Sequence, residues 1–154
     1  MADGMGMVDP TLEQGAPGTR VKPSAYVVTG GGGAIGRAIV AALLRRGAHK
    51  VYVADVNEDA ARQVAGSLGG EALVLDVSDP ASTAATARRL RDAGDRLGGL
   101  VNCAASLGGS SFPDISPEEW DSVLRVNLVG AYRLTVDLLE LFDEGASVVN
   151  IASV

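Results

Sequence analysis

A glycine-rich run at residues 29–36, Thr-Gly-Gly-Gly-Gly-Ala-Ile-Gly, has the composition of a phosphate-binding loop. It follows an apolar run at 25–29 and precedes residues 35–46, whose apolar side chains recur at helical spacing. Glycine permits a tight turn and lets backbone N–H groups approach a phosphate, which the following helix N-terminus attracts. Two registers fit a nucleotide, Gly31-x-Gly33-x-x-Gly36 and Thr29-Gly30-x-x-x-Ala34-x-Gly36. A P-loop is excluded, because Arg37-Ala38 stands where that loop needs lysine followed by serine or threonine.

Asp55 is the second candidate for nucleotide binding. It ends an apolar run at 51–54 and lies 19 residues after Gly36, near the spacing of about 20 expected for a ribose-binding acid. A carboxylate accepts hydrogen bonds from both ribose hydroxyls of NAD and repels the extra phosphate of NADP. Val56 and Asn57 supply no cation to offset that repulsion, so the sequence favours NAD over NADP. The alternative is that Asp55 only caps the turn after its strand.

The elements that must position these residues alternate along the chain. Apolar runs predict five strands at 25–29, 51–54, 72–75, 100–102 and 147–151. Helices are predicted at 35–46, at 58–68 after the cap Asn57, at 80–96 after Asp79, and from Pro117 to Phe142 after Ser116. This alternation predicts an α/β fold, a Rossmann-type doubly wound parallel sheet covered on both faces. We expect the strand order 3-2-1-4-5, with the glycine loop at the switch point between the first and fourth strands.

Four further motifs join the second glycine register. Asp76-Val77 follows the third strand, and Asn102-Cys103-Ala104-Ala105 ends the fourth. Asn127 lies in the last predicted helix, and Ser153 follows the fifth strand. Together, over residues 25–154, they resemble the short-chain dehydrogenase/reductase family, which places an acid near adenine, an Asn-Asn-Ala-Gly motif, a helix asparagine and a catalytic serine at these points.

The resemblance implies an oxidoreductase that moves hydride between a nicotinamide cofactor and a small alcohol or carbonyl substrate. It implies that Ser153 polarises the substrate oxygen and that Asn127 holds a water linking the family's lysine to solvent. It also implies a homo-oligomer for the intact family member. The cofactor-binding residues would be Thr29, Gly30, Gly32, Gly33, Ala34, Ile35, Gly36, Asp55, Asp76, Val77, Asn102 and Ala104.

The chain departs from the family pattern in several places. Ala34 and Ala105 replace glycines, and Cys103 replaces an asparagine. The family's Tyr-x-x-x-Lys pair is absent, since the tyrosines are residues 26, 52 and 132 and the lysines residues 22 and 50. We therefore expect a fragment, truncated after the fifth strand and inactive alone. The alternatives are a natural nucleotide-binding module without turnover and a Rossmann-like methyltransferase, which usually has an acid where Thr29 stands.

Composition limits the remaining possibilities. The 154 residues suffice for one domain, at 25–154, and we expect a loosely packed or disordered tail at 1–24. A net charge of -6 argues against nucleic acid as a partner. One cysteine and one histidine leave no material for a disulfide framework or a zinc site, so no metal is expected. No apolar run has the length of a membrane span and no secretory signal begins the chain, so we expect a cytoplasmic protein.

Overall fold

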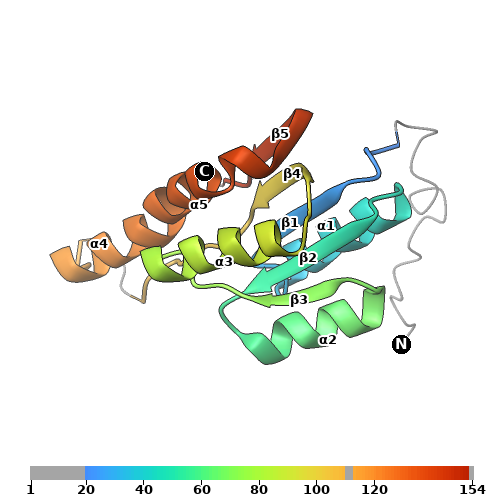
Figure 1. Cartoon of the computed structure of the whole chain (residues 1–154). Helices are drawn as coiled ribbons and strands as arrows, with labels where there is room; N and C mark the ends of the chain where they lie inside the picture. Colours follow the sequence, from blue (N-terminus) through green and yellow to red (C-terminus); the bar gives the residue numbers. More distant parts are fainter. Residues whose placement is uncertain (1–19, 110–112, 153–154) are drawn as a thin grey trace, which may run out of the picture.

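Five parallel strands form one sheet in the order β3-β2-β1-β4-β5 in the computed structural model, which describes residues 20–109 and 113–152 (Figure 1). The strands are β1 (Ala25–Thr29), β2 (Lys50–Asp55), β3 (Glu71–Val74), β4 (Leu97–Asn102) and β5 (Phe142–Asn150). All four neighbouring pairs are parallel, so the predicted order and direction are confirmed. β1 lies between β2 and β4, so the switch point in strand order lies at the carboxyl end of β1, between β1 and β4.

Helices cover both faces of this sheet. They are α1 (Ala34–Arg45), α2 (Glu58–Leu68), α3 (Pro80–Asp92), α4 (Pro117–Leu124), the π-helical segment η2 (Arg125–Gly130), α5 (Ala131–Asp137) and the 3-10 turn η3 (Leu139–Leu141). One buried cluster joins Val27 and Tyr52 of the sheet to Leu90 of α3 and Leu134 of α5. The other joins Val53 to Val40 of α1 and Val64 of α2. The two-sided burial expected of a parallel sheet is therefore present.

The helix starts follow the capping residues that the sequence predicts. The Asn57 side chain accepts a hydrogen bond from the Ala60 amide at 3.1 Å, and Asp79 accepts one from the Ala81 amide at 2.9 Å. Ser116 Oγ accepts one from the Glu119 amide at 3.1 Å. Each cap satisfies a helix N–H that has no partner within its helix.

The prediction of one continuous helix from Pro117 to Phe142 is wrong. The π-helical segment η2 interrupts it, and a 3-10 turn ends it, so that Phe142 begins β5. The wider turn of η2 changes the helical period at that point, and α4 before it has no buried residue. Leu138 is fully buried, whereas Trp120 and Leu128 are 53% and 63% exposed.

Two strands begin three or more residues before their predicted starts, because glycine conceals their pattern. β4 begins at Leu97 and contains Gly98 and Gly99, where an added Cβ would lie 2.6 Å and 3.2 Å from atoms of the Tyr26 side chain. The strand therefore needs small residues at these two positions for the ring to pack against it. β5 begins at Phe142, five residues early, and leaves Val148 and Val149 41% and 46% exposed at the edge of the sheet.

The chain before β1 is held to the domain wherever the structure describes it. The Val21 amide bonds to the Arg46 carbonyl at 3.2 Å. Ser24 Oγ donates to Asp143 at 2.7 Å, and Lys22 donates to the Glu144 carbonyl. The remainder of the expected tail, residues 1–19, lies outside the described part of the chain.

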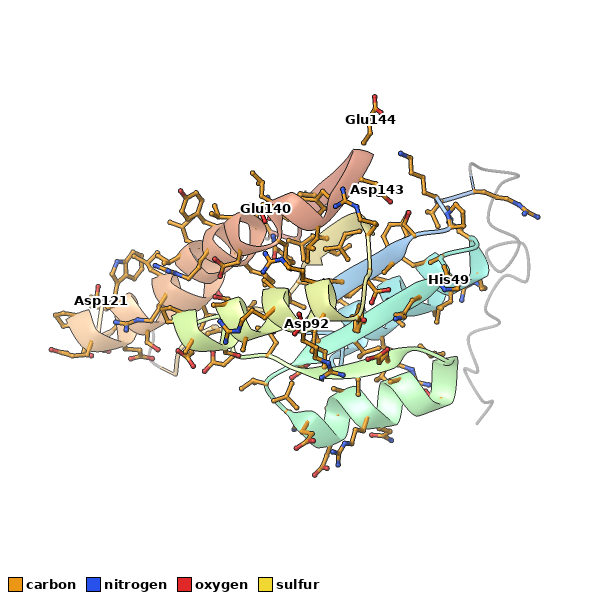
Figure 2. The ribbon with its side chains drawn as sticks, in the orientation of Figure 1. His49, Asp92, Asp121, Glu140, Asp143 and Glu144 are labelled. Atoms are coloured by element: carbon orange, nitrogen blue, oxygen red, sulfur yellow. The ribbon has the colours of Figure 1, made fainter. Side chains whose placement is uncertain are left out.

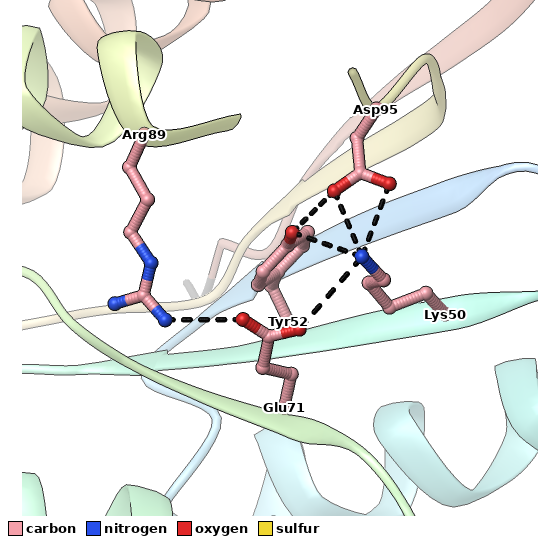
Figure 3. Close-up of polar contacts among 5 residues, drawn as sticks. All are labelled: Lys50, Tyr52, Glu71, Arg89 and Asp95. Carbon is pink, nitrogen blue, oxygen red and sulfur yellow. Dashed lines mark hydrogen bonds and ion pairs between the residues drawn. The ribbon is translucent and has the colours of Figure 1, made fainter. Parts of the chain in front are cut away.

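A polar network crosses the amino-terminal end of the sheet (Figure 3). Lys50 bonds to Asp95 at 3.0 Å and lies 3.8 Å from Glu71, which pairs with Arg89 at 3.0 Å. The Tyr52 hydroxyl donates to the Asp95 carboxylate. Burial of the phenol, followed by its hydrogen bond to Asp95, raises the pKa of Tyr52 to about 12 from its ordinary value of 10.0.

Tyr52 should make the fold sensitive to alkaline pH. Its pKa is higher in the folded chain than in the unfolded one, so its contribution is complete below pH 10 and is lost as pH rises towards 12. We expect this residue to lower the free energy of unfolding by about 1.4 kcal/mol between pH 8 and pH 11. Urea unfolding of wild type and Tyr52→Phe at both pH values measures it. An equal loss in both proteins would contradict the assignment.

Candidate cofactor-binding site

A cleft of about 860 Å³ lies at the carboxyl ends of the strands. Parallel α/β sheets bind ligands at this edge, beside the switch point in strand order. The predicted cofactor residues line it, except Gly32 and Asn102. Further lining residues, which are not among the predicted cofactor-binding residues, are Val56, Leu75, Cys103, Ala105, Ser106, Leu107, Val126, Ile151 and Ala152.

The glycine loop brings the N-terminus of α1 to the cleft. Gly33 caps that helix without any side-chain hydrogen bond, and its first turn contains no acid. The first amides of α1 have no partner within the helix, so the positive end of the helix dipole is available to an anion. Ala34 and Ile35, the first two residues of α1, line the cleft.

Contacts within the loop favour the second glycine register. Gly30 has a φ of 62°, and a Cβ there would lie 2.9 Å from the Cα of Ala104. A Cβ at Gly36 would overlap the Gly30 carbonyl oxygen. At Gly33 an added Cβ would meet only that oxygen, at 3.4 Å, which is an ordinary contact. Both glycines of Thr29-Gly30-x-x-x-Ala34-x-Gly36 are therefore required. In the other register Gly31 is also crowded, with a Cβ 2.8 Å from the Val53 side chain, but Gly33 has room for a side chain.

Thr29 joins the end of β1 to the end of β4. Its hydroxyl oxygen accepts hydrogen bonds from the backbone amides of Cys103 and Ala104, both at 3.0 Å. The side chain is 2% exposed, so these bonds form away from bulk water. They fix the loop after β4 against the glycine loop and so set the distance between two walls of the cleft.

Asp55 accepts two backbone hydrogen bonds at the end of β2. The Gly32 amide donates to Oδ2 at 3.0 Å, and the Asn57 amide donates to Oδ1 at 2.9 Å. The carboxylate thus caps its own turn and also lines the cleft, so the two readings of this residue are compatible. Each carboxylate oxygen retains capacity for a further donor.

Asp76 is held in a similar way after β3. Its Oδ1 accepts from the Ser78 amide at 2.8 Å and from the Ser78 hydroxyl at 2.7 Å. Asp76 and the buried Val77 both line the cleft.

Asn102 faces the helix layer and not the cleft. Its side-chain amide donates to Asn150 at 2.9 Å and to the Thr135 hydroxyl at 3.4 Å. These bonds tie β4 to β5 and α5, which gives Asn102 a supporting position in the sheet. Its own Oδ1 is buried without a hydrogen-bond partner in the described structure.

Asn127 holds the loop that forms one wall of the cleft. It lies in η2, and its side chain accepts from the Ser106 amide at 2.7 Å and donates to the Ser106 carbonyl at 2.8 Å. This paired contact requires a side-chain amide, which offers a donor and an acceptor together. Ser153, the predicted catalytic serine, lies outside the described residues.

Two carboxylates and no basic side chain line the cleft in the described part of the chain. The labelled acids Asp92, Asp121, Glu140, Asp143 and Glu144 lie on outer elements, and His49 is exposed just before β2, at the opposite end of that strand from the glycine loop (Figure 2). The Cys103 thiol lines the cleft, and burial raises its pKa, which disfavours the nucleophilic thiolate.

No group of three or more potential metal ligands comes together in residues 20–109 and 113–152. Over the same residues, no helix combines the length and the apolar character needed to cross a membrane.

Comparison with known proteins shows that the chain matches a protein family. The sequence model of the family described as short chain dehydrogenase matches residues 24–154. D-threitol dehydrogenase from Mycolicibacterium smegmatis is 32% identical over 141 residues, which are 87% of this chain and 54% of that protein. An NADP-dependent (R)-specific alcohol dehydrogenase from Lentilactobacillus kefiri is 32% identical over 142 residues, 88% of this chain and 56% of that one. The chain thus spans about half the length of these curated relatives.

Solved structures share the fold. A 3-ketoacyl-(acyl-carrier-protein) reductase from Brucella melitensis complexed with NADH superposes with a TM-score of 0.77 at 29% identity, covering 86% of this chain and 58% of that one. A structure titled ribose-5-phosphate isomerase from the same organism gives 0.80 at 39% identity, covering 87% and 53%. The relatives and structures named above differ in reaction, and the two cofactors that their names mention are NADP and NADH. The fold alone therefore specifies neither the reaction nor the cofactor of this chain.

Replacement of Thr29 should test whether its hydroxyl joins the two walls of the cleft. Thr29→Val keeps the shape but leaves the Cys103 and Ala104 amides without an acceptor, which should cost about 1–3 kcal/mol of unfolding free energy. Thr29→Ser keeps the hydroxyl and should lose only about 0.8 kcal/mol, for one methyl group. Urea unfolding at neutral pH compares them. A valine variant as stable as the serine variant would refute the role.

Proposed function

The chain belongs to the short-chain dehydrogenase family, and we propose that its cleft binds NAD for hydride transfer to or from a small alcohol or carbonyl substrate. One observation carries the proposal. The uncapped N-terminus of α1 and the carboxylate of Asp55 border one cleft, whose described lining contains no basic side chain. The helix end suits a pyrophosphate, and the carboxylate suits a ribose diol.

The residues present fit such a cofactor along the length of the cleft. The amides at the start of α1 would hold the pyrophosphate, and Asp55 would hold the hydroxyls of the adenosine ribose. Asp76 and Val77 would border the adenine, as the family resemblance implies. The segment from Ala104 to Ser106 and the residues Ile151 and Ala152 would border the other end of the cofactor. When bound, the nicotinamide supplies the hydride chemistry, and the protein orients it.

The charge of the cleft supports NAD over NADP. NADP carries an extra phosphate on the ribose that Asp55 would contact, and a carboxylate at that point repels it. The neighbouring Val56 is apolar, and the Asn57 side chain is occupied as the cap of α2. Relatives of this chain are named with either cofactor, so this preference rests on the described residues of the cleft itself.

The proton chemistry of the reaction is only partly supplied by these 154 residues. We propose that Ser153 polarises the substrate oxygen and that Asn127 acts through the Ser106 loop. None of the three tyrosines lines the cleft. Tyr132 is 71% exposed, and Tyr52 donates to Asp95 with a pKa raised by burial, the opposite of what a general base needs.

Replacement of Asp55 should change the choice of cofactor. Asp55→Ala should weaken NAD binding by roughly 1–3 kcal/mol, the scale of hydrogen bonds to a charged group, and narrow the gap to NADP. Titration calorimetry with each cofactor measures both effects. Asp59→Ala removes the same charge from the exposed first turn of α2, outside the cleft, and should leave both affinities unchanged. Tighter binding of NADP than of NAD by the wild type would reverse the assignment.

Residues 1–154 on their own should bind NAD weakly and show no turnover. No described residue can take the proton-transfer role, and general acid–base catalysis contributes about 10²–10⁴-fold. The assay follows NADH absorbance with a panel of secondary alcohols and ketones, using protein shown to be folded. Turnover that depends on the protein and disappears in Ser153→Ala would show that the catalytic set is completed in another way. Cofactor binding without turnover in the longest natural form would favour a non-catalytic module.

A further inference from the structure

We propose that Gly32 sets the preference for NAD by holding the Asp55 carboxylate in place through its backbone amide. This inference rests on the proposed function and adds a positioning residue to it. Gly32 does not line the cleft, and the family motif leaves its position free. Its amide nevertheless donates to Asp55 Oδ2 at 3.0 Å, from the glycine loop across to the end of β2.

The absence of a side chain at Gly32 is required by two contacts. A Cβ there would lie 2.7 Å from the Cβ of Ala60 in α2 and 2.9 Å from Asp55 Oδ2. Gly32 is not among the glycines with a positive φ, so an alanine would be strained by these contacts and not by its backbone. The Ala60 methyl is fixed on its helix, whereas the Asp55 carboxylate is the movable end of a side chain. An added methyl would therefore displace the carboxylate.

A fixed carboxylate matters for discrimination more than for binding alone. The Asn57 amide bonds to Oδ1 and the Gly32 amide to Oδ2, and these two hydrogen bonds restrain the carboxylate from turning away from an approaching ribose. It then presents acceptors to the diol of NAD and a fixed negative charge to the extra phosphate of NADP. A carboxylate that could turn aside would lose its bonds to NAD and relieve its repulsion of NADP.

The test measures the affinity of Gly32→Ala for both cofactors by calorimetry. NAD affinity should fall roughly tenfold, the scale of one hydrogen bond to a charged group, while NADP affinity should not fall, because the displaced carboxylate repels the extra phosphate less. NAD and NADP share the pyrophosphate, so a merely distorted loop would weaken both equally. Equal losses would overturn the role of Gly32. A wild type that binds neither cofactor would instead overturn the proposed function, and this inference with it.

A double-mutant cycle assigns the effect to Asp55. In an Asp55→Ala background there is no carboxylate to hold, so Gly32→Ala should change NAD affinity less than threefold (about 0.7 kcal/mol). Ala60→Gly removes the 2.7 Å contact and should restore part of the NAD preference to Gly32→Ala. Full tenfold loss in the Asp55→Ala background would overturn the proposal.

Folding controls keep the test decisive. Gly66→Ala makes the same change in α2, where nothing lies within 4 Å, and should leave stability and cofactor preference intact. If Gly32→Ala does not fold, Gly32→Ala in an Ala60→Gly background replaces it and is compared with Ala60→Gly alone. The contact with the Ala60 methyl is then removed, while the added Cβ still lies 2.9 Å from Asp55 Oδ2. A lower NAD-to-NADP ratio in the double variant supports the held carboxylate, and equal ratios overturn it.

Discussion

The close approach of the turn after β1 to the start of α1 is the constraint on which the site depends. Gly36 leaves no room for a side chain beside the carbonyl of Gly30, and Gly30 itself needs a left-handed backbone next to Ala104. Because this turn is so tight, α1 starts directly at the edge of the sheet and its free amides border the cleft. The same turn carries Gly32 to the end of β2, where it meets Asp55.

The glycine-rich turn depends in its own right on hydrogen bonds on both sides of β1, where the strand order switches. β1 has β2 on one side and β4 on the other, and the loops after these strands diverge to open the cleft. Thr29 bridges one side through its hydroxyl, and Asp55 bridges the other through its carboxylate. Asn127 adds a third bond from the helix layer to Ser106. Side chains that sequence motifs suggest as ligand contacts therefore also hold the backbone that makes the contacts.

Sequence patterns predicted the elements well where their signal was local. Caps at Asn57, Asp79 and Ser116 set helix starts, and apolar runs ending in Asp55 or Asn102 set strand ends. The interruption at η2 was not predicted, because no local sequence signal marks it. Its last residue, Gly130, lies so close to the Val77 carbonyl that an added Cβ would be 2.6 Å from the oxygen, a contact between segments far apart in the chain. The side of the sheet to which the Asn102 side chain points was not predictable either. β4 is buried on both faces, so its sequence has no alternation of polar and apolar residues that would distinguish the two faces.

Selection of the cofactor and selection of the substrate are separable in this architecture. Every contact proposed for NAD comes from residues before Ser153, and the proposed preference for NAD over NADP rests on a few atoms around Asp55. Ile151 and Ala152 are exposed at the far end of the cleft, where a substrate would meet the nicotinamide. On this proposal, the residues that would bind the cofactor can be common to enzymes with different substrates, while exchange of one carboxylate or one glycine would change which cofactor is used.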